Sequence, residues 1–107
     1  MTYIENLNYI KKNVSFKERF AQLAEEATEL AKAALKYRRT LDDENPTPVS
    51  GDEAFKNLIE EIDDIALCLD TLSFKWRVEF NSLQREQKLN RWVERLKNAS
   101  KRVSEKS

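Results

Sequence analysis

The stretch Pro46-Thr47-Pro48-Val49-Ser50-Gly51 contains both prolines and the only glycine of this 107-residue chain. Proline and glycine are the residues that most strongly interrupt regular structure, so a chain that has them in one place only is expected to consist mostly of long helices. The prolines also bias the backbone before them toward extended conformations. We therefore predict one loop over residues 42–51, with helices on both sides of it.

The sequence before this loop predicts two helices. Residues 1–12 have apolar side chains at the spacing of a short amphipathic helix. Ser15 and Glu18 then form a capping box, in which Ser is the N-cap and Glu is the third helical residue. Good helix formers follow without a breaker, so the second helix should run from about residue 16 to about residue 41.

The sequence after the loop predicts two further helices. Ser50 and Glu53 form a second capping box, so the third helix should begin near residue 52 or 53 and end between residues 73 and 80. Asn81-Ser82 is the predicted break before a fourth helix. Together the four helices predict an all-α, four-helix bundle-like fold with one domain over residues 1–107.

Three of these helices carry an apolar stripe on a wheel of about 100° per residue. In the second helix the stripe consists of Phe16, Phe20, Leu23, Ala27, Leu30 and Ala34. In the third it consists of Leu58, Ile62, Ile65, Leu69, Leu72 and Trp76, with Phe80 continuing it. In the fourth it consists of Leu89, Trp92, Leu96, Ala99 and Val103.

The composition excludes several classes of protein. Lys plus Arg and Asp plus Glu are equal at 19 each, and this balance argues against a nucleic-acid-binding protein. A single cysteine cannot form an intrachain disulfide, so a reducing cytoplasm is the expected compartment. No apolar run has the length of a membrane span. The chain has no histidine, which excludes Ser-His-Asp and Cys-His catalytic triads.

Two acidic pairs border the stripes of the central helices. Glu26 and Glu29 are three residues apart in the second helix, and Glu61 and Asp64 are three apart in the third. Residues three apart share a helix face, so two packed helices could direct four carboxylates into one cleft. Carboxylates at close range raise each other's pKa values, and Mg²⁺ resolves this because it takes oxygen ligands. The alternative is that both pairs belong to solvated faces, in a chain whose residues are 36% charged.

Other polar residues near these pairs have two interpretations. Lys32 and Lys36 lie on the same side of the second helix as Glu29, where a cation could hold a phosphate oxygen. The alternative is a surface ion pair at i,i+3 or i,i+4. Cys68 lies one turn after Asp64 and is interpreted as a packing residue, because Mg²⁺ avoids thiols.

The central helices resemble the MazG-like superfamily of all-α nucleoside triphosphate pyrophosphohydrolases, over roughly residues 15 to 75. The resemblance rests on an ExxE…ExxD signature, here Leu23-Ala24-Glu25-Glu26-Ala27-Thr28-Glu29-Leu30 and Asn57-Leu58-Ile59-Glu60-Glu61-Ile62-Asp63-Asp64-Ile65. It implies Mg²⁺-dependent hydrolysis of a nucleoside triphosphate to the monophosphate and pyrophosphate, with Mn²⁺ as a possible substitute. The implied metal ligands are Glu26, Glu29, Glu61 and Asp64.

The same resemblance suggests roles for residues outside the metal ligands. Glu25 or Glu60 would orient the attacking water. The segment Lys88-Leu89-Asn90-Arg91 is similar to one that many members place over the phosphates or the base, which makes Lys88, Asn90 and Arg91 candidate substrate-binding residues. The competing hypothesis is a non-catalytic helical interaction module, or a member of the family that has lost catalysis.

Three aromatic residues bear on assembly. Trp76, Phe80 and Trp92 exceed what the third helix needs for packing against the second. They predict a homodimer or homotetramer whose interface covers them, because a small monomer would otherwise expose apolar surface. The alternative is that they close the core of the monomer.

Overall fold

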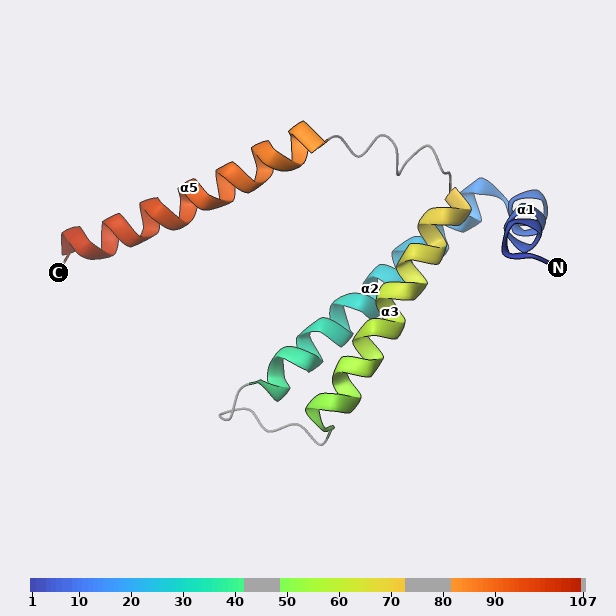
Figure 1. Cartoon of the computed structure of the whole chain (residues 1–107), viewed down its shortest axis with the longest axis horizontal. Helices are drawn as coiled ribbons and strands as arrows, with labels where there is room; N and C mark the ends of the chain where they lie inside the picture. The colour runs from blue at the N-terminus through green and yellow to red at the C-terminus, as the bar shows by residue number, and fades with distance from the viewer. Residues whose placement is uncertain (42–48, 73–81, 107) are drawn as a thin grey trace. The chain divides into compact units, whose positions relative to one another are not determined.

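The computed structural model describes residues 1–41, 49–72 and 82–106, and all regular structure in these ranges is helical. The helices are α1 (Tyr3–Asn13), α2 (Phe16–Thr40), α3 (Gly51–Leu72) and α5 (Ser82–Lys106) (Figure 1). The all-α class is therefore confirmed. The contacts of the chain divide it into two compact units, Met1–Phe74 and Lys75–Ser107, which are described separately below.

Side-chain caps start the first three helices, as the sequence patterns predicted for two of them. The Ser15 hydroxyl accepts a hydrogen bond from the backbone N–H of Glu18 at 3.1 Å, and Ser50 accepts one from Glu53 at 3.2 Å. Thr2 caps α1 in the same way. Each bond satisfies one N–H that has no partner inside the helix.

The predicted boundaries around α3 need one correction. Gly51 was assigned to the loop, but it is the first residue of α3. The physical reason is that Ser50 is the N-cap, so the residue directly after it is already helical. The predicted end of this helix, the break at Asn81, and the aromatics Trp76 and Phe80 lie outside the described residues. The predicted fourth helix is α5, which begins at Ser82.

In the first unit, α2 and α3 lie side by side as an antiparallel pair (Figure 1). The side chains that turn inward from α3 include three buried residues, Ala54, Cys68 and Leu72. Six half-buried positions of α2 recur at intervals of three or four residues and are Arg19, Leu23, Glu26, Leu30, Ala33 and Tyr37, and Lys36 and Thr40 are half-buried as well. Such spacing marks one continuous contact face of a helix.

This contact face agrees with the predicted stripes in part. The stripe residues that are buried or half-buried, as predicted, are Leu23, Leu30, Leu58, Ile65, Leu69 and Leu72. Phe20 and Ile62 were expected in the stripes, but they are 39% and 48% exposed. Ala27 and Ala34 are exposed as well, whereas Glu26 and Glu61 are half-buried. The seam contains small residues such as Ala33 and Ala54, which let two helices approach closely, together with half-buried leucines such as Leu23 and Leu58. The carboxylates consequently lie in the seam and not merely at its border.

Helix α1 is held against the end of this pair by one apolar anchor and by polar bonds. Leu7 is the buried residue of α1, with 6% exposure. The Tyr3 hydroxyl donates a 2.6 Å hydrogen bond to Oδ2 of Asp70 in α3. Arg19 donates to the backbone carbonyls of Val14 and Thr71, so its guanidinium ties the α1–α2 turn to the end of α3.

The second unit is the helix α5, whose described side chains, residues 83–105, are all exposed. Trp92 is 62% exposed and Leu96 is 61% exposed.

The two units carry opposite formal charges. Residues 1–74 contain nine Lys or Arg and fifteen Asp or Glu, a net charge of −6. Residues 75–107 contain ten Lys or Arg and four Asp or Glu, a net charge of +6. The net charge of zero for the whole chain is therefore the sum of an acidic unit and a basic unit.

Among the described residues, no helix combines the length and the apolar character that crossing a membrane requires.

Candidate metal centre

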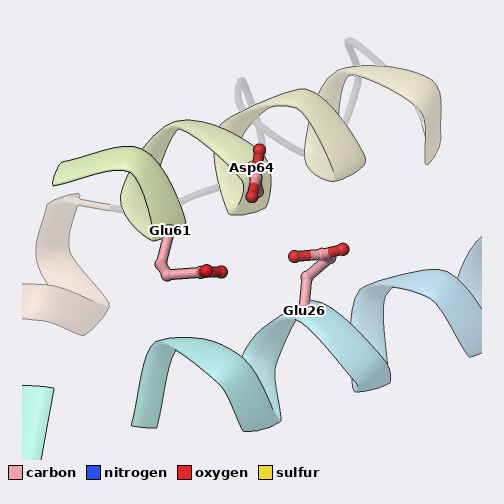
Figure 2. A group of neighbouring side chains, drawn as sticks. All are labelled: Glu26, Glu61 and Asp64. Carbon is pink, nitrogen blue, oxygen red and sulfur yellow. The ribbon is translucent and has the colours of Figure 1, made fainter. Parts of the chain in front are cut away.

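Three carboxylates from the two central helices converge in the seam of the first unit. Figure 2 shows Glu26 of α2 facing Glu61 and Asp64 of α3. One oxygen of each lies within 4.8 Å of one oxygen of the other two. We call these three residues the acidic cluster. It contains three of the four ligands that the sequence predicted.

Glu61 is the most constrained member of the acidic cluster. Its Oε2 is buried and has no hydrogen-bond partner among the described residues. Burial raises the pKa of Glu61, and the negative charges of Asp64, Glu26, Glu29 and Glu60 raise it further, in that order. A buried acceptor without a donor is costly, and a positive charge placed beside it would offset both causes of the shift.

Gln22 fixes the position of Glu26. Its Nε2 donates a hydrogen bond to Oε1 of Glu26 at 3.0 Å, one turn away on α2. This bond leaves the other carboxylate oxygen of Glu26 available. Partners that orient a ligand in this way are a regular part of metal sites. Gln22 was not among the predicted site residues, although its i,i+4 spacing from Glu26 indicates that the two side chains can meet.

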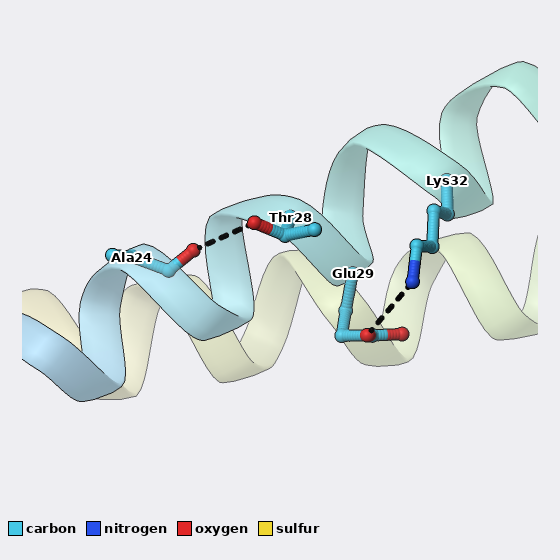
Figure 3. A network of polar contacts seen from close by, with 4 residues as sticks. All are labelled: Ala24, Thr28, Glu29 and Lys32. Atoms are coloured by element: carbon cyan, nitrogen blue, oxygen red, sulfur yellow. Dashed lines mark hydrogen bonds and ion pairs between the residues drawn. The ribbon is translucent and has the colours of Figure 1, made fainter.

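The fourth predicted ligand, Glu29, is not a member of the acidic cluster. Its Oε1 forms an ion pair with Nζ of Lys32 at 3.5 Å (Figure 3). The same view shows Thr28 donating to the carbonyl of Ala24, so Thr28 serves its own helix. Lys32 therefore forms a surface ion pair at i,i+3. This pair is the alternative to phosphate binding that the sequence left open. Glu29 lies one helical turn after Glu26, near enough for its charge to raise the pKa of Glu61.

The residues of the acidic cluster fit a hard divalent cation. Two oxygens bound to one Mg²⁺ at about 2.1 Å can be at most about 4.2 Å apart. The observed limit of 4.8 Å is therefore close to what one ion needs, and small side-chain rotations would close the difference. All donors are carboxylate oxygens, which suit Mg²⁺ or Mn²⁺ and not a soft metal.

The remaining predicted residues lie apart from the acidic cluster. Glu25 and Glu60 are exposed neighbours of Glu26 and Glu61, and Lys36 is half-buried on α2. The candidate substrate-binding residues Lys88, Asn90 and Arg91 belong to α5 in the second unit, where all three are exposed.

Cys68 is a packing residue, as the sequence analysis concluded. Its side chain is 6% exposed, and it is not part of the group that could hold a metal. Burial raises the pKa of the Cys68 thiol, and the charges of Glu26 and Asp64 raise it further. The thiol therefore stays protonated over a wider pH range than an ordinary cysteine, which disfavours a role as thiolate ligand.

A cavity of about 810 Å³ opens beside the acidic cluster. Glu26 and Asp64 belong to its wall, and residues of α1, α2 and α3 form the rest. Its apolar lining includes Leu7, Ile10 and Leu67, and the amides of Asn6 and Gln22 face the same space. Apolar walls with a few polar groups are typical of small-molecule sites of this size. This cavity could not be predicted from the sequence, because it depends on where α1 packs against α2 and α3.

No protein-family model, no curated protein and no solved structure matches this chain.

The raised pKa of Glu61 leads to a prediction about stability. In metal-free protein, Glu61→Gln should raise the free energy of unfolding at pH 7. The folded state binds the Glu61 proton more tightly than the unfolded state does, so the contribution of Glu61 to wild-type stability falls as pH rises above about 4.5, through the raised folded pKa. The gain from Gln should therefore shrink toward zero as pH falls to about 4.5.

Urea denaturation in EDTA at several pH values measures this gain. The control is Glu25→Gln, which removes a charge at an exposed position outside the acidic cluster. An equal gain in both variants at every pH would show that Glu61 experiences no special environment.

Proposed function

We propose that this protein is a divalent-metal-dependent hydrolase that cleaves nucleoside triphosphates to the monophosphate and pyrophosphate. The observation that carries the proposal is the acidic cluster, two of whose members, Glu26 and Asp64, line a cavity large enough for a nucleotide. The apolar cavity suits a base and sugar, and the cluster suits the polyphosphate once a cation is bound. The resemblance of the two acidic motifs to MazG-like enzymes supports the same reaction.

Electrostatics makes a cation necessary for this substrate. A triphosphate brings several negative charges to a place that already has three carboxylates, and like charges at about 4 Å repel each other strongly in a partly buried site. Glu26, Glu61 and Asp64 would hold the ion, with Gln22 keeping Glu26 in place. When bound, Mg²⁺ or Mn²⁺ would supply the positive charge that neutralises the phosphates and the charge that develops during the reaction.

The chain's own residues would position the water and the substrate. A water attacks the α-phosphorus, the bond to the oxygen that bridges the α- and β-phosphates breaks, and pyrophosphate leaves. Glu25 is an exposed carboxylate beside Glu26, and it could orient this water and accept its proton. Asn6 and the apolar wall would hold the base and sugar.

The experiment is a product screen. Purified protein with Mg²⁺ is offered canonical and modified nucleoside triphosphates, and monophosphate, pyrophosphate and orthophosphate are quantified. We expect equal amounts of monophosphate and pyrophosphate with at least one substrate, and no product in EDTA. Release of orthophosphate would contradict attack at the α-phosphorus. No turnover with any substrate would favour the non-catalytic interaction module.

A further inference from the structure

The first unit has an apolar surface on the flank of α2 and α3 that lies away from the acidic cluster. Phe20, Phe55, Ile59 and Ile62 are 39–49% exposed. At about 100° per residue, each lies about 100° or more around its helix from Glu26 or Glu61. The exposed Ala27 and Ala34 extend this surface along α2. We call Phe20, Phe55, Ile59 and Ile62, with these two alanines, the hairpin face.

Helix α5 has an apolar stripe of its own. Leu89, Trp92, Leu96 and Val103 recur at intervals of three, four and seven residues and are 57–70% exposed. Seven-residue repetition of this kind is the pattern of a helix that packs on other helices. One border of the stripe is basic, because Lys88, Arg95 and Arg102 follow each other at seven-residue intervals beside it.

Pairing of either surface with its own copy brings like charges together. Two antiparallel α5 helices would place the border of Lys88, Arg95 and Arg102 against the same basic border. Two parallel α5 helices would set this border against Val93 and Ser100, which offer no charge to pair with. Two hairpin faces would bring together units that each carry a net charge of −6. Like charges at an interface select against such pairings.

Pairing of α5 with a hairpin face brings opposite charges together. The unit of α5 has a net charge of +6 and the unit of the hairpin face has −6. Asp52 and Asp63 are exposed on α3 at the border of the hairpin face, within about 40° of Ile59 on the wheel. The lengths also match, because 25 residues of α5 span about 37 Å and 22 residues of α3 span about 33 Å.

We propose that the hairpin face is a docking surface for α5 of a second copy of this chain, in a reciprocal dimer. Each copy gives its α5 and receives the partner's, so one two-fold axis covers both apolar surfaces in both copies. Trp92 is the central anchor, since aromatic residues in the middle of an interface contribute most of its binding energy. The inference goes beyond the proposed function, because it does not involve the acidic cluster.

The test uses one variant of each surface, Trp92→Asp and Ile62→Asp, and measures mass by sedimentation equilibrium. Wild type should be a dimer at micromolar concentration, and each variant should have a dimer dissociation constant raised at least about 30-fold, the loss typical of an interface hot spot. Both positions are largely exposed, so circular dichroism should show unchanged helix content. Trp92→Phe, the matched control, should remain dimeric.

Because the charges are complementary, the wild-type dimer should weaken as salt increases.

Mixing the two variants decides between the possible pairings. The α5 of the Ile62→Asp chain and the hairpin face of the Trp92→Asp chain are both intact, so the mixture should form heterodimers that neither variant forms with itself. A mixture that stays monomeric would overturn the proposal, as would a monomeric wild type or a dimeric Ile62→Asp protein. Binding of monomeric wild type to anionic vesicles or DNA through Trp92 would also overturn it, in favour of a basic membrane- or nucleic-acid-binding helix.

Discussion

Replacement of Glu61 by Gln should abolish metal-dependent pyrophosphate release. Gln keeps the size of the side chain and one acceptor oxygen, but it lacks the charge that holds a hard cation. Loss of a residue that only orients a metal ligand typically costs 10- to 100-fold in metal affinity or activity, so loss of a ligand should cost at least about 100-fold. The helices should remain intact, because the change relieves repulsion among Glu61, Asp64 and Glu26.

The matched control is Glu60→Gln, the adjacent residue on α3. Its side chain is exposed and is not a member of the acidic cluster, so its replacement should cost far less activity. Initial rates of pyrophosphate release at saturating Mg²⁺ compare the two variants. If Glu60→Gln were inactive and Glu61→Gln active, the second acidic pair would be Glu60 and Asp63, one residue from the pair proposed here.

The second large effect is expected at Leu7. Its side chain is 6% exposed and anchors α1, so Leu7→Ala should lower the free energy of unfolding by about 2–5 kcal/mol. The control Ile4→Ala is on the same helix, but Ile4 is 57% exposed, and surface substitutions usually change stability by less than about 0.5 kcal/mol. Urea denaturation at constant pH measures both. Equal losses would show that α1 does not pack as described.

Leu7 is also part of the cavity wall, so its replacement should affect ligand binding as well as stability. It lines the cavity beside the acidic cluster together with Ile10 and Asn6 of α1. If α1 detaches when Leu7 is truncated, the cavity loses one wall while Glu26, Glu61 and Asp64 keep their places on α2 and α3. Leu7→Ala should therefore weaken nucleotide binding more than metal binding.

Helix positions could be predicted from the sequence because the signals that set them are local. Ser15 and Ser50 cap the helices that their spacing from Glu18 and Glu53 predicted. Both prolines lie between α2 and α3, and the only glycine of the sequence is the first residue of α3. The acidic motifs also followed from local spacing, which placed Glu61 and Asp64 on one side of α3.

The side of each helix that packs against its neighbour could not be predicted in full in the same way. The seam keeps predicted stripe residues such as Leu23 and Leu58, but it also contains Glu26 and Glu61. The predicted stripe residues Phe20, Ala27 and Ile62 are exposed. Which face packs depends on how closely two particular surfaces fit, and the sequence of one helix does not contain that information. Glu29 pairs with Lys32 at i,i+3 on the same helix.

The opposite charges of the two units can be counted in the sequence, but the net charge of the whole chain does not reveal them. The unit boundary near residue 74 separates −6 from +6, and only the structure gave a reason to count the two parts separately. Net charge is informative for a surface that a partner meets, so it should be counted for each structural unit.

Titration with Mn²⁺ tests the central claim most directly, because it reports on the acidic cluster without requiring the substrate. Free Mn²⁺ is followed by electron paramagnetic resonance as wild type, Glu61→Gln and Glu60→Gln proteins are added. The acidic cluster predicts one bound ion per chain in wild type and in Glu60→Gln, with affinity lowered at least about 100-fold in Glu61→Gln. Equal binding by all three proteins, or no binding to wild type at millimolar Mn²⁺, would contradict a metal centre at Glu26, Glu61 and Asp64.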